Sequence, residues 1–307
     1  MLQTGHPGLR QALRQPQPGA TAQIDTSATT RPRCQVGCGA AVEADFFDAV
    51  VTPPGPYPRL FGLPRHPVSA IDYAIGFYAS ALVRDGGTLQ IGIGALADAL
   101  CHALALRHTD NAAYRRVLAA LDPDIEHHPA VIASGGLDPL PQGLYGCSEM
   151  INEGFKRLVE CGVLRRKVVE KQSLMQRLAD GSASEHDHAL LERDGQFLHG
   201  AFYLGSPAFY DWLRHLDDDT RRGIDMRRVS EVNELYGGNE TLERLQRRDA
   251  RFFNSCMMAT ALGAAVSGGA GVGWQGTDHF VYTSVGSRLQ IEAALANHDI
   301  LSLPVQV

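Results

Sequence analysis

The stretch Gly143–Leu164, GLYGCSEMINEGFKRLVECGVL, decides the fold. A glycine-rich turn leads into an amphipathic segment, which predicts a helix that stops at Gly162. Glu149 lies at the expected start of this helix among small and apolar neighbours. Partial desolvation raises the pKa and the reactivity of a carboxylate in such surroundings, so Glu149 is a candidate nucleophile or base. The alternative is structural: Ser148 or Asn152 caps the helix, and an acid at its start is favoured by the helix dipole.

Composition narrows the class of protein. The chain has 307 residues, of which 44% are hydrophobic, as in an ordinary soluble globular protein with a sizeable core. The formal charge of -6 and the lack of a long basic run argue against nucleic-acid binding. No apolar run is long enough to cross a membrane, and the N-terminus lacks the apolar core of a secretory signal. We therefore expect a cytoplasmic protein without membrane attachment.

Cysteine and histidine spacing predicts no metal site. The six cysteines are scattered, and free thiols are the default in so long a chain. Cys34 and Cys38 lack a second ligand pair at a suitable distance, and His127-His128 stands alone in a polar loop.

The sequence predicts an irregular N-terminal segment followed by one α/β domain. Residues 1–67 are rich in Pro, Gly, Thr and Gln and predict an irregular segment, the remnant of a preceding domain. Residues 68–307 alternate strand-like and helix-like pieces. A helix starts at Ser69 with Asp72 as the partner of a capping box. Strand 88–93 and a helix over 95–107 follow it.

The later segments continue this alternation. We expect strands at 163–169 and 197–204, a helix from Pro207, and a strand followed by a turn over 226–238. Residues 242–266 predict a charged helix start followed by an apolar run, whereas 171–195 are polar and predict a mobile loop. The pattern predicts an α/β fold: an open, mostly parallel sheet with flanking helices.

Gly92-Ile93-Gly94 joins the strand at 88–93 to the following helix. A strand that breaks at glycines and enters a helix presents backbone N–H groups at the helix N-terminus, which suits an anion or oxyanion. The third glycine of a dinucleotide fingerprint is missing, and a tight strand-to-helix turn explains the same glycines.

Five motifs in order resemble the C-terminal catalytic part of the acetyl-CoA hydrolase/transferase family, the class I CoA-transferases. They are TLQIGIGALADAL (88–100), the opening stretch, FLHGAFYLGSPAFYDWL (197–213), MRRVSEVNELYG (226–237) and RRDARFFNSCMMATALGAAV (247–266). The likeness covers about 41–266. It implies a CoA-transferase-like (NagB/RpiA-like) domain that takes coenzyme A as substrate and holds no permanent cofactor.

The resemblance also implies residue roles. The glutamate of Ser148-Glu149-Met150 attacks the acyl-CoA carbonyl, and an acyl-glutamyl anhydride and a glutamyl-CoA thioester follow. The Ile93 N–H of the G-x-G loop donates to the oxyanion, with Gly92 and Gly94 shaping the coenzyme A site. Asn233 positions the glutamate or the substrate, although a turn before Tyr236 accounts for it equally well. Asn254 and the Met257-Met258 pair are expected to support the core.

The chain departs from the family at both ends. Only the last stretch of a complete N-terminal domain is present, and the domain is incomplete or divergent after 266. The glycines beyond that point look like a shortened version of the family's second oxyanion segment, where Gly268 or Gly271 is the expected donor and coenzyme A contact.

Three functions are weighed. The first is an acyl-CoA hydrolase or CoA-transferase using Glu149, with acyl-CoA and a small carboxylate as partners and a homodimer left open. The second is a truncated, non-catalytic relative that keeps the fold and at most binds coenzyme A or a partner chain. The third is a thiol hydrolase using Cys147, for which the sequence offers no histidine base at a recognisable spacing.

Overall fold

The computed structural model describes residues 67–233 and 238–254, and outside these ranges Gly62 and the backbone of four short strands. Those strands form two small pairs. β1 (Thr21–Gln23) runs parallel to β2 (Ala49–Val51), and β8 (Met258–Ala259) runs antiparallel to β9 (Ala265–Val266). The predictions for most of 1–67 and for Gly268 and Gly271 lie outside the described residues.

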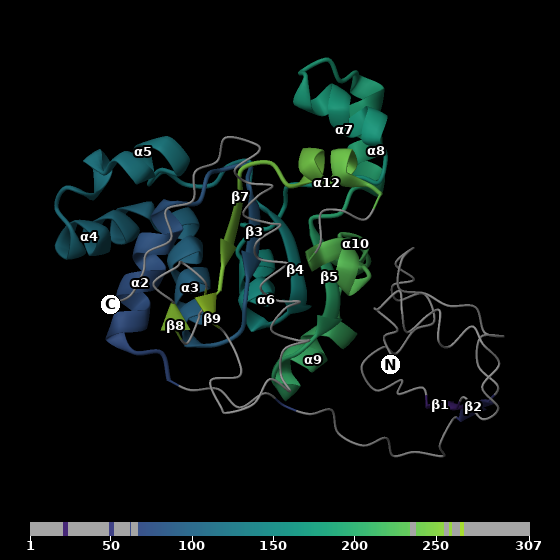
Figure 1. The fold of residues 1–307 in the computed structure, drawn as a ribbon, viewed down its shortest axis with the longest axis horizontal. Coiled ribbons are helices and arrows are strands. Elements are labelled where there is room, and N and C mark those ends of the chain that lie inside the picture. Colours follow the sequence, from purple (N-terminus) through teal and green to yellow (C-terminus); the bar gives the residue numbers. More distant parts are fainter. Residues whose placement is uncertain are drawn as a thin grey trace.

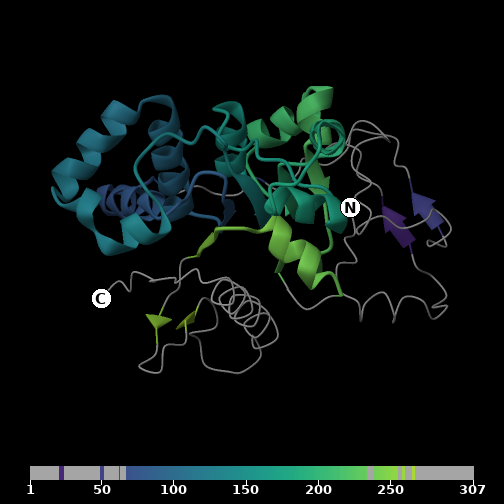
Figure 2. The same cartoon turned by 90° about the horizontal axis from the view of Figure 1, so that it is seen from above.

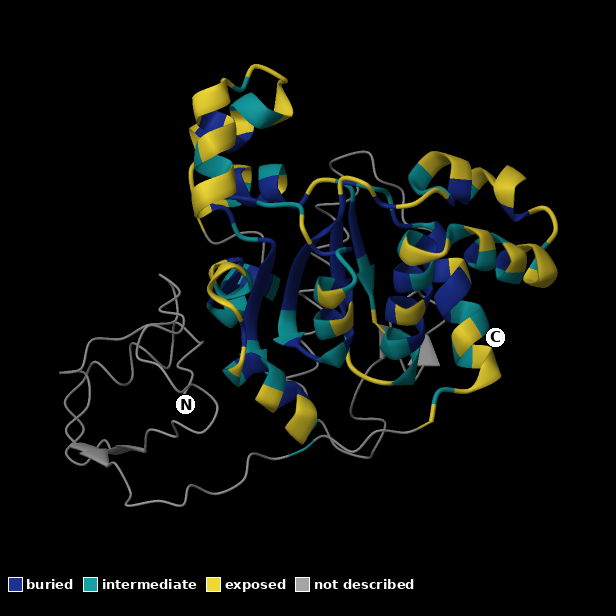
Figure 3. Ribbon diagram, turned by 180° about the vertical axis from the view of Figure 1, so that it is seen from behind, coloured by how far each residue is buried: buried dark blue, intermediate teal, exposed yellow. Residues whose placement is uncertain are grey.

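A five-stranded sheet in the order β6-β5-β4-β3-β7 forms the centre of the molecule, and every pairing in it is parallel. The strands are β3 (Thr88–Ile91), β4 (Tyr145–Ile151), β5 (Leu198–Tyr203), β6 (Ile224–Met226) and β7 (Ala250–Phe253). The strands are mostly buried because helices lie on both sides of the sheet (Figure 3). The expected open, parallel α/β fold is confirmed.

Helices cover the two faces of the sheet (Figures 1 and 2). On one face, Leu104 and Phe155 share an apolar core with the strands. The helices of that face are α3 (Ala95–Thr109), α6 (Glu153–Glu160) and α9 (Pro207–Arg214). On the other face a second core holds Val232. The helices of that face are α7 (Gln172–Ala179), α11 (Val229–Asn233) and α12 (Glu240–Gln246).

A third apolar core lies beside the sheet, where Phe77 and Tyr114 stack with their ring centroids 5.7 Å apart. It joins α3 to α2 (Ala70–Ala81), α4 (Asn111–Leu121), η2 (Ile125–His127) and α5 (Pro129–Ser134). The two remaining described helices are α8 (Glu185–Asp194) and α10 (Asp218–Arg222). None of the described helices is both long and apolar enough to cross a membrane.

Local sequence signals account for several helix boundaries. Ser69 and Asp72 form the expected capping box at the start of α2. Ser206 caps α9 with Pro207 in its first turn. Gly162, at φ 76°, follows the end of α6 as expected of a C-terminal glycine.

Two predictions on the C-terminal side of Glu149 are wrong. Residues 163–169 form no strand and make only isolated bridges, Leu144–Leu164 and Val168–Gln196, because they pair at single positions and not along a continuous register. The supposed mobile loop at 171–195 holds α7 and α8. Ser184 and Asp187 form a second capping box there, and Asp187 pairs with Arg177 across the two helices.

The secondary structure predicted for the segments after 226 is also wrong. Asn233 lies at the end of helix α11 and not in a turn, and the helix expected to start at 242 ends at Gln246 and is followed by β7. Asn254 is exposed and does not support the core. It exchanges two amide hydrogen bonds with Gln90 on the neighbouring strand, at 2.9 and 3.1 Å.

Candidate functional site

Glu149 belongs to strand β4 and not to the start of a helix. The helix starts later, at α6, and Asn152 caps it by accepting a hydrogen bond from Gly154 N–H at 2.9 Å. Of the two expected caps, Asn152 is therefore confirmed and Ser148 is wrong. The Ser148 hydroxyl instead donates to the Ile91 carbonyl at 2.9 Å and ties β4 to β3. The capping explanation consequently does not account for Glu149.

The predicted catalytic groups gather at one edge of the sheet. Gly92–Gly94 follow β3, Glu149 is close to the end of β4, and Asn233 ends the helix that follows β6. All of these strands are parallel, so their carboxyl ends meet at the same edge. Ligands of open α/β sheets bind outside this edge.

Asn233 contacts Glu149 directly. The Asn233 side-chain amide donates to Oε2 of Glu149 at 2.7 Å, and both residues are half-buried. The two residues are 84 positions apart in the chain, and only the sheet and α11 bring them together. An amide donor on one carboxylate oxygen fixes the orientation of the group and leaves the other oxygen available for chemistry.

Hydrogen bonds to two neighbouring segments hold the G-x-G loop in place. Gly92 donates its backbone N–H to the Phe253 carbonyl at 3.1 Å, and its own carbonyl accepts from the Asn152 amide at 3.1 Å. Gly94 has φ 114° and ψ -179°, a conformation open essentially to glycine alone. No atom lies within 4 Å of a Cβ placed there, so the need for glycine comes from the backbone and not from crowding.

Ile93 is 42% exposed at this edge, between the two glycines. Among the described residues its backbone N–H has no hydrogen-bond acceptor. An unoccupied N–H at a strand-to-helix junction is what an oxyanion donor requires. The role of Ile93 stays a prediction, and so does the contribution of Gly92 and Gly94 to a coenzyme A site.

Cys147 does not have the surroundings of a thiol nucleophile. Its side chain is buried in the second core, at 1% exposure. The fold places a histidine, His199, at the matching position of the neighbouring strand, which the sequence alone could not reveal. Both ring nitrogens of His199 are engaged, however: Nδ1 with the Tyr145 hydroxyl at 2.6 Å and Nε2 with Oε1 of Gln196 at 2.8 Å.

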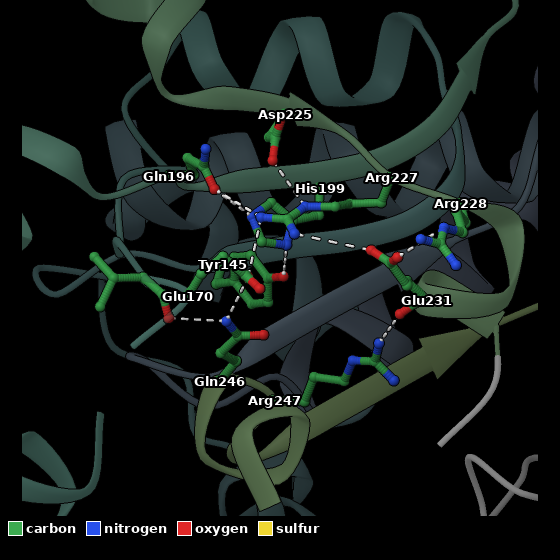
Figure 4. A network of polar contacts seen from close by, with 11 residues as sticks. Tyr145, Glu170, Gln196, His199, Asp225, Arg227, Arg228, Glu231, Gln246 and Arg247 are labelled. Atoms are coloured by element: carbon green, nitrogen blue, oxygen red, sulfur yellow. Dashed lines mark hydrogen bonds and ion pairs between the residues drawn. The ribbon is translucent and has the colours of Figure 1, made fainter. Parts of the chain in front are cut away.

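A largely buried polar network surrounds Arg227 (Figure 4). Tyr145 of this network and Val232 of α11 belong to the same apolar core, so the network and α11 lie on the same face of the sheet. The Arg227 guanidinium pairs with Asp225 at 2.7 Å, Glu170 at 3.0 Å and Glu231 at 3.8 Å. A second buried arginine, Arg247, donates to the Glu231 carbonyl and lies 3.5 Å from Glu243. No sequence pattern predicts this network, because its members are dispersed over 145–247 with no recurring spacing.

Burial shifts the ionisation of the network's titratable groups. Desolvation raises the pKa of Glu243 to about 7, with Glu231, Glu240 and Glu170 acting in the same direction and Arg247 against it. Desolvation, reinforced by Arg227 and Arg247, holds the pKa of His199 well below its usual value. Neutral His199 therefore carries its proton on Nε2, which donates to Gln196, and accepts from Tyr145 at Nδ1.

A small cleft of about 300 Å³ opens over this network. Its walls carry acidic, basic and amide groups, with Leu242 as the apolar exception: Glu170, His199, Arg227, Glu231, Asn239, Leu242, Glu243, Gln246 and Arg247. Within 67–233 and 238–254 no group of three His, Cys, Asp or Glu side chains is arranged to hold a metal ion.

Comparison with solved structures identifies the fold. RipA from Yersinia pestis aligns with a TM-score of 0.51 at 19% identity, over 90% of this chain and 43% of RipA. Two RipA variants with single substitutions align at 0.54, with 20% and 21% identity, over 90% of this chain and 44% of theirs. A 4-hydroxybutyrate CoA-transferase from Porphyromonas gingivalis aligns at 0.34 with 18% identity, over 62% of this chain and 33% of that protein, which is too weak to bear on the fold.

The sequence itself matches no family model, and no curated protein matches it. The chain spans less than half of the length of the RipA structures. At these identities the alignments show a common fold and nothing finer. The chain therefore has the α/β fold of RipA over the part that aligns.

Proposed function

We propose that this chain is the catalytic part of an acyl-CoA hydrolase or CoA-transferase in which Glu149 is the nucleophile. The observation that carries the proposal is the 2.7 Å hydrogen bond from Asn233 to Glu149, at the carboxyl edge of a parallel sheet and on the edge that bears the G-x-G loop. Five sequence motifs in family order and the common fold with RipA support it.

In the first half of the reaction a carboxylate oxygen of Glu149 attacks the thioester carbonyl. The C–S bond breaks, coenzyme A leaves as its thiolate, and an acyl-glutamyl anhydride forms. The thiolate then attacks the glutamyl carbonyl, which releases the acyl group as a carboxylate and leaves coenzyme A as a glutamyl thioester. No step needs an oxidant, a metal ion or a resident cofactor.

In the second half, an acceptor carboxylate attacks the glutamyl thioester and the same steps run in reverse to give a new acyl-CoA. Attack by water instead releases free coenzyme A and restores Glu149, which is hydrolysis. The Ile93 N–H is the proposed donor to the oxyanion of each addition step, where one such donor contributes about 3 kcal/mol. The Asn233 amide holds the carboxylate in its attacking orientation.

Glu149→Gln tests the nucleophile, because the amide keeps the size of the side chain and can still accept the hydrogen bond from Asn233. Acetyl-CoA consumption is measured with and without added acetate or succinate, together with the balance of free coenzyme A. We expect the parent to consume acetyl-CoA and E149Q to lose at least about 1000-fold in rate, as for removal of a covalent nucleophile. Borohydride or hydroxylamine trapping should modify Glu149, as read by mass spectrometry.

The non-catalytic alternative predicts a different result: a folded parent protein that neither consumes acetyl-CoA nor is modified at Glu149. This alternative is considered because the chain aligns with less than half of the length of the RipA structures, so activity of a whole protein does not follow for the aligned part. Activity that appears only after a second polypeptide is added would indicate that the site needs residues from outside this chain.

A further inference from the structure

Helix α11 carries Asn233 and is only five residues long, Val229–Asn233. A helix of this length is not stable without contacts to the rest of the protein, because so few backbone hydrogen bonds offset the cost of nucleation. The position of the Asn233 amide on Glu149 therefore depends on whatever holds α11 to the sheet.

Two kinds of contact hold α11. Val232 is buried at 1% exposure in the second core, and this apolar contact is not directional. The other contacts converge on Glu231, the residue just before it. The Arg247 guanidinium donates to the Glu231 carbonyl, and Arg227 pairs with the Glu231 carboxylate at 3.8 Å. The contact from Arg247 is a charge-assisted hydrogen bond, which fixes orientation as well as position, and the contact from Arg227 is a longer ion pair.

The same network also holds the strand that carries Glu149. Tyr145 of β4 bonds through His199 to Gln196, whose Oε1 accepts from Arg227 at 3.2 Å. Strand β4, which carries Glu149, and helix α11, which carries Asn233, are therefore both bonded to the network shown in Figure 4. Arg227 and Arg247 are 6% and 8% exposed, so water does not compete strongly for their hydrogen bonds.

We propose that Arg247 and Arg227 are positioning residues, which clamp α11 through Glu231 so that the Asn233 amide stays on Glu149. Arg247, at the C-terminal end of α12, donates to the backbone carbonyl of Glu231 in α11. Arg227, directly after β6, pairs with the Glu231 carboxylate. The catalytic consequence rests on the proposed function, whereas the clamp itself does not.

The test compares Arg247→Met with Arg107→Met. Arg107 is a matched control: it is 2% exposed and donates to the carbonyls of Asp138, Ser80 and Val83, at 2.7 to 2.8 Å, none of which lies on α11. Amide hydrogen exchange of 229–233 is measured in both variants, with helix α9 (207–214), which carries neither substitution, as the internal reference. Acetyl-CoA turnover is measured on the same samples.

We expect R247M to accelerate exchange at 229–233 by about 30-fold relative to the reference helix, the effect of losing one charge-assisted hydrogen bond. Its kcat falls by about tenfold or more, while its KM stays within about twofold, because a misplaced Asn233 impairs the chemical step and not binding. R107M leaves exchange at 229–233 and kcat at the parent's values once both are compared at equal folded fraction.

Arg247→Lys secures the test if R247M does not fold. Lysine keeps a positive charge beside Glu243 but lacks the planar fork that spans two acceptors, so its exchange and kcat are expected between those of the parent and R247M. Unchanged exchange at 229–233 in R247K would overturn the clamp. Faster exchange with parental kcat would overturn the positioning role while leaving the proposed function intact.

Failure of the proposed function has its own signature. If E149Q turns over acetyl-CoA at the parent's rate, or if the parent has no turnover, the nucleophile assignment fails and the exchange comparison still decides whether Arg247 holds α11. The two ideas are therefore contradicted by different measurements.

Discussion

The carboxyl edge of the sheet and the polar network beneath it are built in opposite ways. At the edge, the part of the chain that the structure describes gives the Glu149 carboxylate one hydrogen bond, from Asn233, and both residues are half-buried. The G-x-G loop leaves a backbone N–H without an acceptor among the same residues. In the network, Arg227 alone pairs with three carboxylates and is 6% exposed. The edge has unused hydrogen-bonding capacity, whereas the charged groups of the network face partners of opposite charge.

This difference predicts that the edge of the sheet mainly determines turnover and that the network mainly determines stability. Groups that are to react with a substrate must have free lone pairs or N–H donors, which contribute little to folding. Buried charges contribute strongly when any one partner is removed, because the remaining charges are left without compensation. Substitutions at the edge are thus expected to act mainly on turnover. Substitutions in the network are expected to act mainly on the free energy of unfolding, and on turnover only through the position of α11.

The largest expected effect is on stability, from Arg227→Met. Removing this guanidinium charge leaves the buried Asp225 carboxylate without its cation, and the more exposed Glu170 and Glu231 also lose a partner. We expect the free energy of unfolding to fall by about 3 to 5 kcal/mol, as for breaking a buried ion pair. Urea unfolding followed by circular dichroism measures it. E149Q is the control at the edge and should change stability by less than about 0.5 kcal/mol. Equal losses in the two variants would contradict the division between edge and network.

Asn233→Ala should have the opposite profile. It removes the only amide donor to Glu149 among the described residues, so turnover of acetyl-CoA should fall by about 10- to 100-fold, the range for a hydrogen bond to a charged group. Stability should change little because Asn233 ends a helix at a half-buried position. Asn239→Ala is the matched control, since Asn239 is exposed and makes no capping hydrogen bond. A loss of turnover in N239A as large as that in N233A would argue against a specific role for the amide.

Gly94→Ala tests the backbone of the edge. Alanine at φ 114° and ψ -179° is strained by about 1 to 3 kcal/mol, and relief of that strain would move the Ile93 N–H. We expect a smaller free energy of unfolding together with reduced turnover. Gly162→Ala is the control, because Gly162 has φ 76° and open space around its Cβ position but lies at the far end of α6. If G162A and G94A reduced turnover equally, the loop geometry would not be what matters.

Sequence patterns predicted the framework of this molecule well. Capping residues and glycines carry their information locally, so α2, α3 and α9 began at Ser69, Gly94 and Ser206 as their sequences indicate. The grouping of Glu149, Asn233 and the G-x-G loop followed from the resemblance to a family and from the parallel sheet, and the contact at 2.7 Å is consistent with it. The functional roles of these residues stay predictions.

The errors came from contacts that no local pattern records. The segment at 171–195 is polar, yet α7 is held by Leu174 and Met175 in the second core and α8 by the pairing of Asp187 with Arg177. Glu149 was assigned to a helix start because apolar residues follow it, whereas pairing of β4 with β3 and β5 extends the strand through Ile151. Tertiary pairing decided both cases over local preference.

Glu243→Gln has the smallest expected effect, and it tests how the ionisable groups of the network make stability depend on pH. Because burial raises the pKa of Glu243 from its unfolded value of 4.5 to about 7, the folded state binds more protons than the unfolded state between these values. This group therefore makes the protein more stable as pH falls from 7 towards 5, and the contribution is lost as pH rises through 7. His199 acts in the opposite direction: its pKa is lowered in the folded state, so its contribution is lost as pH falls below about 6.5.

The E243Q variant separates these two contributions. Without the Glu243 carboxyl group the stabilisation on lowering the pH from 7 is lost while the His199 contribution remains, so E243Q should lose more stability than the parent between pH 7 and pH 5, by about 1 kcal/mol. This figure is below the full shift because the cleft above Glu243 is open to solvent. Urea unfolding at the two pH values measures the difference, and Glu240→Gln, on the same helix but more exposed, is the matched control. A steeper pH dependence in E240Q than in E243Q would assign the titrating carboxyl group to Glu240 and not to the buried Glu243, which lies 3.5 Å from Arg247.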